Sequence, residues 1–175
     1  RSGRGTLLSD MTTPPRSVVI TGCSTGIGEC AALRLDRLGW QVFAGVRRAE
    51  DGRRLAEKAS HRLRWILLDV TDEDSIAAAT AQVAEAVGSN GLQGLVNNAG
   101  IAVGGPIEGV PLDQLRWQFE VNVIGLVAVT QAMIPLLRLA KGRIVTIGSI
   151  AGRVTSPVVG ADCASQHAVE AVTDA

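Results

Sequence analysis

A glycine-rich segment near the start of the chain constrains the fold more than any other feature. The apolar run 18–21 leads directly into TGCSTGIG at residues 21–28, after which apolar side chains recur at helical spacing as far as Gly39. A strand, a tight glycine turn and a helix in this order predict the first βα unit of a nucleotide-binding sheet. The unpaired N–H groups at the start of such a helix attract phosphate, so the segment predicts a phosphate-binding turn.

Short β-branched runs alternate with amphipathic stretches along the rest of the chain, which is typical of a parallel sheet built from βαβ units. Right-handed crossovers then give an α/β fold of the Rossmann type, a doubly wound parallel sheet with strand order 3-2-1-4-5. Because this fold continues to a sixth strand, we expect the sheet to be C-terminally truncated. The predicted strands are 18–21, 41–46, 64–69, 95–98 and 142–148, and the predicted helices are 27–38, 50–59, 71–87, 111–139 and one that begins near Asp162.

Local signals place some of the helix ends. Thr71 followed by Asp74 is similar to a capping box, which predicts the start of the third helix. Pro111 suits the first turn of the long fourth helix, in which Gly125 and Pro135 are the expected weak points.

The length of 175 residues suits one domain, which we place at residues 17–175. Residues 1–16 are polar and rich in Arg, Ser, Thr and Pro, and we expect a disordered tail or an expression remnant there. Basic and acidic residues balance at 17 each, so no net field attracts nucleic acid or an anionic membrane. The longest apolar run, 121–129, is shorter than a membrane span.

The cysteines are odd in number and lack the spacing of metal ligands. Cys23, Cys30 and Cys163 are therefore expected to be free thiols that fill the core of a cytoplasmic protein, and no metal site is predicted. His61 and His167 are far apart in the sequence and are expected to be surface or packing residues.

Three segments together resemble the short-chain dehydrogenase/reductase family: TGCSTGIG with three residues between Gly22 and Gly26, NNAG at 97–100, and Ser149 at the end of the fifth strand. The resemblance implies a nicotinamide cofactor along the carboxyl edge of the sheet, with Asp69 and Val70 beside the adenine. The residues that it implies for cofactor binding are Gly22, Ser24, Thr25, Gly26, Ile27, Gly28, Arg47, Asp69, Val70, Asn98, Ala99 and Gly100.

The end of the second strand distinguishes NADP(H) from NAD(H). A carboxylate there binds the ribose 2′-hydroxyl, whereas an arginine accommodates a 2′-phosphate. Arg47 and Arg48 follow Val46 directly, and no acidic residue occurs before Glu50. We therefore expect NADP(H) to be preferred, while Arg53 and Arg54 are expected on a solvated helix face.

The catalytic motif departs from the family pattern. The family donates its proton from the tyrosine of a Tyr-x-x-x-Lys motif, and this chain contains no tyrosine. Twelve residues separate Ser149 from Asp162, which occupies the tyrosine position, and Gln166 occupies the lysine position. By the same resemblance Ser149 would bind the substrate oxygen and Asn122 would complete a proton relay, although a loop serine and a structural amide are alternatives.

The departure predicts oxidoreductase activity that is absent or severely reduced. An aspartate is an anion at neutral pH with no proton to donate, and it is shorter than tyrosine. Three interpretations remain: an altered hydride-transferring enzyme, an NADP(H)-binding pseudoenzyme or interaction module, and a fragment that folds poorly. The small apolar segments 103–107 and 150–157 suggest a lipophilic alcohol or ketone as substrate. The resemblance also implies a homodimer or homotetramer.

Overall fold

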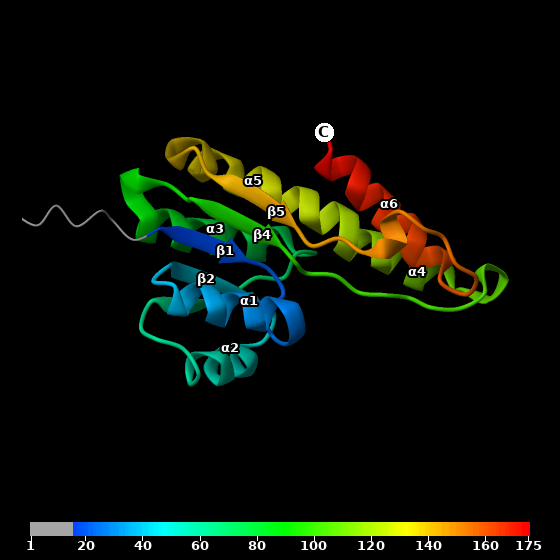
Figure 1. Ribbon diagram of the computed structural model, residues 1–175, viewed down its shortest axis with the longest axis horizontal. Coiled ribbons are helices and arrows are strands. Elements are labelled where there is room, and N and C mark those ends of the chain that lie inside the picture. The colour runs from blue at the N-terminus through cyan, green and yellow to red at the C-terminus, as the bar shows by residue number, and fades with distance from the viewer. Residues whose placement is uncertain (1–15) are drawn as a thin grey trace, which may run out of the picture.

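The computed structural model describes residues 16–175, which form a five-stranded parallel sheet with strand order β3-β2-β1-β4-β5 (Figure 1). The predicted fold class and strand order are confirmed. The order reverses between β1 and β4, so the loops after these two strands diverge and leave a crevice at the carboxyl edge. The strands are β1 (Ser17–Ile20), β2 (Gln41–Val46), β3 (Leu63–Leu67), β4 (Gly94–Asn97) and β5 (Arg143–Thr146).

Helices cover both faces of the sheet, and Figure 1 shows α1 and α2 on one side and α5 on the other. Alternate residues of β1 and β2 enter two separate cores: Val18 and Val42 pack toward α1 and α2, and Val19 and Phe43 pack toward α3 and α5. Burial on both faces explains why these strands are continuously apolar. The helices are α1 (Gly26–Arg37), α2 (Ala49–Ala56), α3 (Glu73–Val87), α4 (Leu112–Phe119), α5 (Gly125–Ala140) and α6 (Gly160–Thr173).

Two expected helix starts are wrong in detail. The cap of α3 is Asp72, whose carboxylate accepts hydrogen bonds from the N–H groups of Asp74 and Ser75 at 3.0 and 3.2 Å. Thr71 instead donates to Asp69. Pro111 is the residue before α4 rather than its first helical residue.

The long fourth helix is interrupted, although not at the expected weak points. A π-helix over Glu120–Ile124 joins α4 to α5, and Pro135 lies within α5. Asn122 lies in the middle of this π-helix and is buried, with 2% of its surface exposed. Such π-bulges occur frequently at functional sites.

By length and composition alone, the continuous helical stretch Leu112–Ala140 could cross a membrane. The sequence-based expectation considered only the shorter run 121–129. Val129, Met133 and Leu137 of α5 are buried in the core shared with α3 and the sheet. This face of the stretch therefore packs against the protein, while 28% of the apolar window is buried in all.

The chain start can be followed from Arg16, and the rest of the expected tail lies outside the described residues. The carbonyl of Arg16 accepts a hydrogen bond from the Gln41 N–H. The guanidinium of Arg16 lies 4.5 Å from the centroid of the Trp40 ring.

Gly125 allows α5 to approach the loop after β3. A Cβ atom built at Gly125 would lie 2.7 Å from the Val70 carbonyl oxygen and 2.8 Å from its side chain. Gly125→Ala should therefore lower the free energy of unfolding by about 1–2 kcal/mol, because a backbone atom must move. Helix propensity alone predicts the opposite effect, an increase of about 1 kcal/mol in the free energy of unfolding.

Urea unfolding measures this effect. Gly160→Ala is the matched control, because its Cβ would meet only the tip of Ile107 at 4.0 Å at the start of α6. Its stability should be unchanged or slightly higher. A stabilised Gly125→Ala protein would contradict the close approach of α5 to Val70.

Candidate functional site

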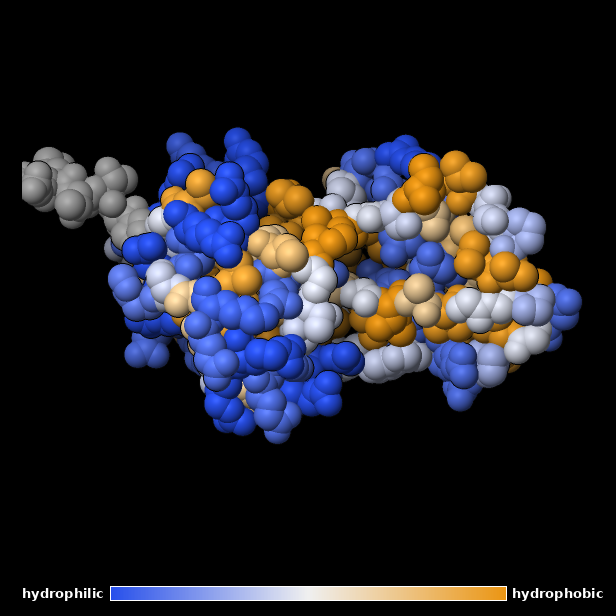
Figure 2. Space-filling view, turned by 60° about the horizontal axis from the view of Figure 1, so that its bottom comes forward, coloured by the Kyte–Doolittle hydropathy of each residue, from blue (hydrophilic) through white to orange (hydrophobic). Residues whose placement is uncertain are grey.

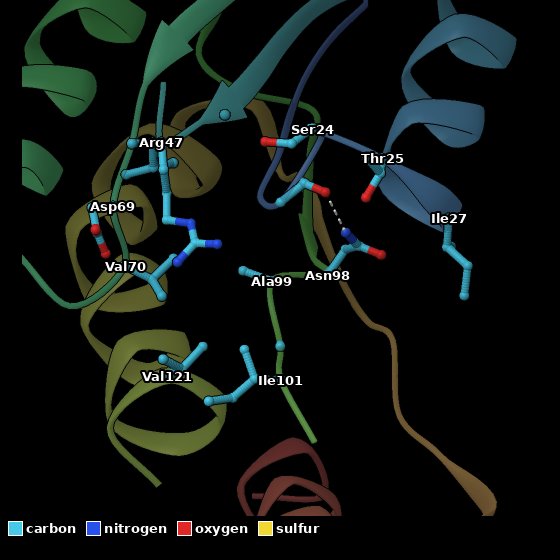
Figure 3. Close-up of a pocket in the computed structure, with 14 residues that line it drawn as sticks. Ser24, Thr25, Ile27, Arg47, Asp69, Val70, Asn98, Ala99, Ile101 and Val121 are labelled. Carbon is cyan, nitrogen blue, oxygen red and sulfur yellow. Dashed lines mark hydrogen bonds between the residues drawn. The ribbon is translucent and has the colours of Figure 1, made fainter. Parts of the chain in front are cut away.

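A cavity of about 300 Å³ lies at the carboxyl edge of the sheet, between the glycine turn after β1 and the ends of β2, β3 and β4. Figure 3 shows Arg47, Asp69 and Val70 on one side of this cavity and Ser24, Thr25 and Asn98 on the other. The structure brings most of the predicted cofactor residues into its lining: Gly22, Ser24, Thr25, Ile27, Arg47, Asp69, Val70, Asn98, Ala99 and Gly100. We call it the first cavity.

Hydrogen bonds hold the glycine turn against the loop after β4. The Thr21 hydroxyl oxygen accepts from the N–H groups of Asn98 and Ala99, both at 2.9 Å. The Asn98 side-chain amide donates to the carbonyls of Thr21 and Gly22 at 2.8 and 3.1 Å, and the second of these bonds is drawn in Figure 3. Asn98 is therefore a clamp for the turn as well as a lining residue.

The two predicted residues outside the lining, Gly26 and Gly28, shape the turn from behind. Gly28 packs so closely that an added Cβ would overlap the Gly22 carbonyl oxygen. Gly26 begins α1 with φ +64°, and a Cβ there would meet nothing within 4 Å. The start of α1 is thus open to a phosphate group, so this cradle fits the pyrophosphate of a dinucleotide.

Arginine side chains surround the end of β2. Arg47 points into the first cavity (Figure 3), and no ion pair is formed by it among the described residues. Asp51 binds Arg48 at 3.6 Å and Arg54 at 3.0 Å, both within α2 or at its start. Arg54 also donates to the Ser24 carbonyl at 2.8 Å, so it joins α2 to the glycine turn. Arg54 is exposed on α2, as expected for a solvated helix face, and makes these contacts at the surface.

Asp69 has two roles in the geometry. One carboxylate oxygen accepts from the N–H and the hydroxyl of Thr71, at 3.0 and 2.8 Å, and so fixes the loop before α3. The same side chain lines the first cavity beside Val70. The loop is thereby held in place at the rim of the cavity.

A second cavity, of about 310 Å³, continues from the first toward α6. It brings together the four residues predicted for the catalytic positions, which come from the long helix, the loop after β5 and α6: Asn122, Ser149, Asp162 and Gln166. Ser149 is exposed, and its hydroxyl oxygen also accepts a bond of 3.2 Å from the Ala151 N–H.

A buried polar network supports the second cavity. The Asn122 amide exchanges two hydrogen bonds with the backbone of Ile101, at 2.8 and 2.9 Å, and also donates to the Ser165 hydroxyl. Gln118 is completely buried, and its amide nitrogen donates to Ser165 at 2.9 Å and to the Asp162 carboxylate at 3.2 Å. The Gln118 amide oxygen accepts from the Val103 N–H at 2.6 Å. The Asn122 side chain is therefore fully engaged in structural bonds.

Sequence reasoning missed Gln118 and Ser165. The partners of Gln118 on α6 lie 44 and 47 residues away along the chain, so no local pattern connects them. The available signal was a glutamine one helical turn before Asn122, on the same face of a helix.

None of the three cysteines lines the first or the second cavity. Cys23 and Cys163 are buried as expected, whereas Cys30 is exposed. Burial raises the pKa of the Cys23 thiol to about 12, which keeps it protonated. His61 and His167 are at the surface. No group of three or more potential metal ligands occurs within the described residues.

Comparisons with known proteins agree with this geometry. The chain is 44% identical over 158 residues to retinol dehydrogenase 16 of Mus musculus, an alignment that covers 90% of this chain and 50% of that protein. It is 40% identical over 165 residues to the NADPH-dependent 3-dehydrocapnine reductase of Ornithobacterium rhinotracheale, covering 91% of this chain and 58% of that protein. The chain thus spans about half the length of these curated relatives.

A solved structure and a family profile point the same way. The crystal structure of a short-chain dehydrogenase from Streptomyces avermitilis superimposes with a TM-score of 0.86 at 31% identity, covering 94% of this chain and 60% of that one. The profile described as short chain dehydrogenase matches residues 16–175. The fold, the glycine cradle and these matches together establish that the chain belongs to the short-chain dehydrogenase family of oxidoreductases.

Proposed function

We propose that this chain binds NADP(H) in a trough formed by the two cavities, and that its capacity for hydride transfer is absent or severely reduced. The observation that carries the proposal is the continuity of the trough. The first and second cavities share five lining residues, Ile27, Asn98, Ala99, Gly100 and Ile101. A dinucleotide can therefore extend from Arg47 at one end to Gln166 at the other.

The end of β2 supports NADP(H) over NAD(H). Arg47 would bind a 2′-phosphate through charge-assisted hydrogen bonds. Asp51, in the first turn of α2, is paired with Arg48 and Arg54, so its negative charge is compensated. One of the relatives described above carries the name of an NADPH-dependent reductase.

A bound nicotinamide supplies or accepts the hydride. The chain itself has to bind and orient the substrate and to exchange a proton with it. Ser149 is exposed at the second cavity and can donate a hydrogen bond to a substrate oxygen. Asn122 holds the backbone at Ile101, which lines both cavities. These two residues would position a substrate without exchanging a proton with it.

The proton donor is the missing element. Asp162 and Gln166 stand where the family has tyrosine and lysine, and the chain has no tyrosine elsewhere to replace the phenol. The Asp162 carboxylate accepts a hydrogen bond from the Gln118 amide, which holds the shorter side chain in place. General acid catalysis typically contributes about 10²–10⁴-fold to a rate, so its loss would nearly abolish turnover.

A lipophilic alcohol or ketone fits the surface near the second cavity. The segments 103–107 and 154–160 meet there, because the Gly105 N–H donates to the Val158 carbonyl at 2.6 Å. Ile107, Ile150 and Val158 are all more than half exposed in this region. In Figure 2 hydrophobic residues gather over this end of the molecule, whereas the end with α1 and α2 is largely hydrophilic. An exposed apolar surface of this kind suits an apolar ligand.

A non-catalytic, NADP(H)-binding pseudoenzyme is the second candidate. The polar network favours it, because Gln118 gives Asp162 a specific and buried hydrogen-bond partner. The departure from the family motif is therefore accommodated by its surroundings.

Arg47→Asp tests the cofactor preference. The change should weaken NADPH binding relative to NADH binding by roughly 10- to 100-fold, since a charged hydrogen bond contributes about 1.5–3 kcal/mol. Fluorescence or calorimetric titration with both cofactors measures the ratio. Arg53→Asp is the control, because Arg53 is exposed on α2 and absent from the cavity lining. Equal losses in the two variants would contradict a specific role for Arg47.

The double substitution Asp162→Tyr with Gln166→Lys tests the catalytic proposal. In the full-length protein it should raise NADPH-dependent carbonyl reduction by about 10²–10⁴-fold, because it restores a proton donor and its neighbouring cation. NADPH consumption over a panel of apolar ketones and aldehydes measures the gain. Adding Ser149→Ala should remove most of it. A double variant that binds NADPH but reduces no carbonyl would favour the pseudoenzyme.

A further inference from the structure

The two ends of the trough differ in charge. Arg47 lines the first cavity together with Asp69. The second cavity has a single charged side chain in its lining, Asp162, and the remaining lining residues are neutral. Within the described part of the chain, the second cavity therefore has a negative charge and no lining cation.

Asp162 is fixed in its position and has no cationic partner. Its carboxylate accepts from the Gln118 amide at 3.2 Å, and it appears in none of the ion pairs among the described residues. It lies in the first turn of α6, where the helix dipole favours an anion. Glu170, the other carboxylate near this part of α6, is paired with Arg153 at 2.6 Å. The unpaired charge that faces the cavity is thus that of Asp162.

Gln166 adds a second acceptor. Its amide oxygen is buried, lacks a hydrogen-bond partner and belongs to a side chain of the same lining. Because this oxygen is buried, a ligand in the cavity does not contact it, but its partial negative charge adds to that of Asp162 four residues earlier on α6. The carboxylate and this oxygen make the potential of the second cavity negative.

The oxidised and reduced cofactors differ in the charge of the nicotinamide ring. The nicotinamide ring of NADP⁺ has a positive charge, and that of NADPH has none, while the adenosine, ribose and phosphate groups are the same. With the ring in the second cavity, the Asp162 carboxylate of its lining would stabilise the charged form specifically. We propose that the second cavity selects the oxidised cofactor, so that this chain binds NADP⁺ in preference to NADPH. This inference rests on the proposed NADP(H) trough.

The proposed preference for NADP⁺ follows from the residues at positions 162 and 166. Replacement of a lysine by glutamine and of a tyrosine by aspartate makes this end of the trough more negative by two charges. A site with this charge releases the neutral form more readily than the cationic one. Occupancy of the chain would then follow the oxidised fraction of the cofactor pool.

Equilibrium titration of the protein with three probes tests the proposal: NADP⁺, NADPH, and 2′-phospho-ADP-ribose, which lacks the nicotinamide ring. The unaltered protein should bind NADP⁺ about tenfold more tightly than NADPH, equivalent to about 1.4 kcal/mol. Asp162→Asn keeps the shape of the side chain and an acceptor for Gln118, and it should reduce the preference to about twofold or less. Binding of 2′-phospho-ADP-ribose should not change.

Two further variants make the result specific. Gln166→Lys leaves Asp162 and its bond to Gln118 in place but adds a cation, so it should also reduce the preference for NADP⁺. It carries the test if Asp162→Asn fails to fold. Asp113→Asn is the matched control, because Asp113 is likewise an aspartate in the first turn of a helix but lies outside both cavity linings.

The outcomes separate this inference from the proposed function. Saturable binding of NADP⁺ and NADPH with equal affinity, or a preference that persists in both variants, would overturn the selection of the oxidised form and leave the trough intact. If none of the three probes binds, the NADP(H) trough itself fails and this inference fails with it. If 2′-phospho-ADP-ribose alone binds, the second cavity does not accept the nicotinamide, which overturns the inference as well.

Discussion

The hydrogen bonds between Asn98 and the turn at Thr21 and Gly22 are the interaction on which the rest of the site depends. They join the ends of β1 and β4, the two neighbouring strands between which the sheet order reverses. Parallel strands leave their last carbonyl and N–H groups unpaired where the loops diverge, and here the Asn98 amide and the Thr21 hydroxyl satisfy them. Because both cavities include Asn98, the clamp sets the geometry of the whole trough.

The long helix couples the two halves of this trough through adjacent residues. Val121 lines the first cavity and Asn122 lines the second, and both belong to the π-helix between α4 and α5. Three residues further on, Gly125 approaches Val70 at the floor of the first cavity. An uninterrupted α-helix would direct Asn122 differently, so the π-helix is what allows one element to serve both cavities.

Local signals in the sequence were sufficient for the fold and for the first cavity. Strand and helix periods, and the glycines of the first turn, depend on residues close together in the chain, and the strand order follows from general rules of handedness. The network of Gln118, Asn122 and Ser165 could not be predicted in this way, because its bonds join α4 and the π-helix to α6 across more than 40 residues. The hydrogen bond from Arg54 to the Ser24 carbonyl could not be predicted for the same reason, since the two residues are 30 positions apart.

The two cavities are built in different ways, so a change at residues 162 and 166 would alter the second cavity and leave the first in place. The first cavity is shaped by backbone atoms, positive φ angles and close glycine contacts, none of which involves residues 162 or 166. The second depends on side chains of α6, of which Asp162 is held by a hydrogen bond from Gln118. The hydrogen bond from Gln118 fixes the position of the Asp162 carboxylate at the second cavity. The proposed loss of proton transfer and the proposed preference for the oxidised cofactor would therefore both follow from the side chain at position 162.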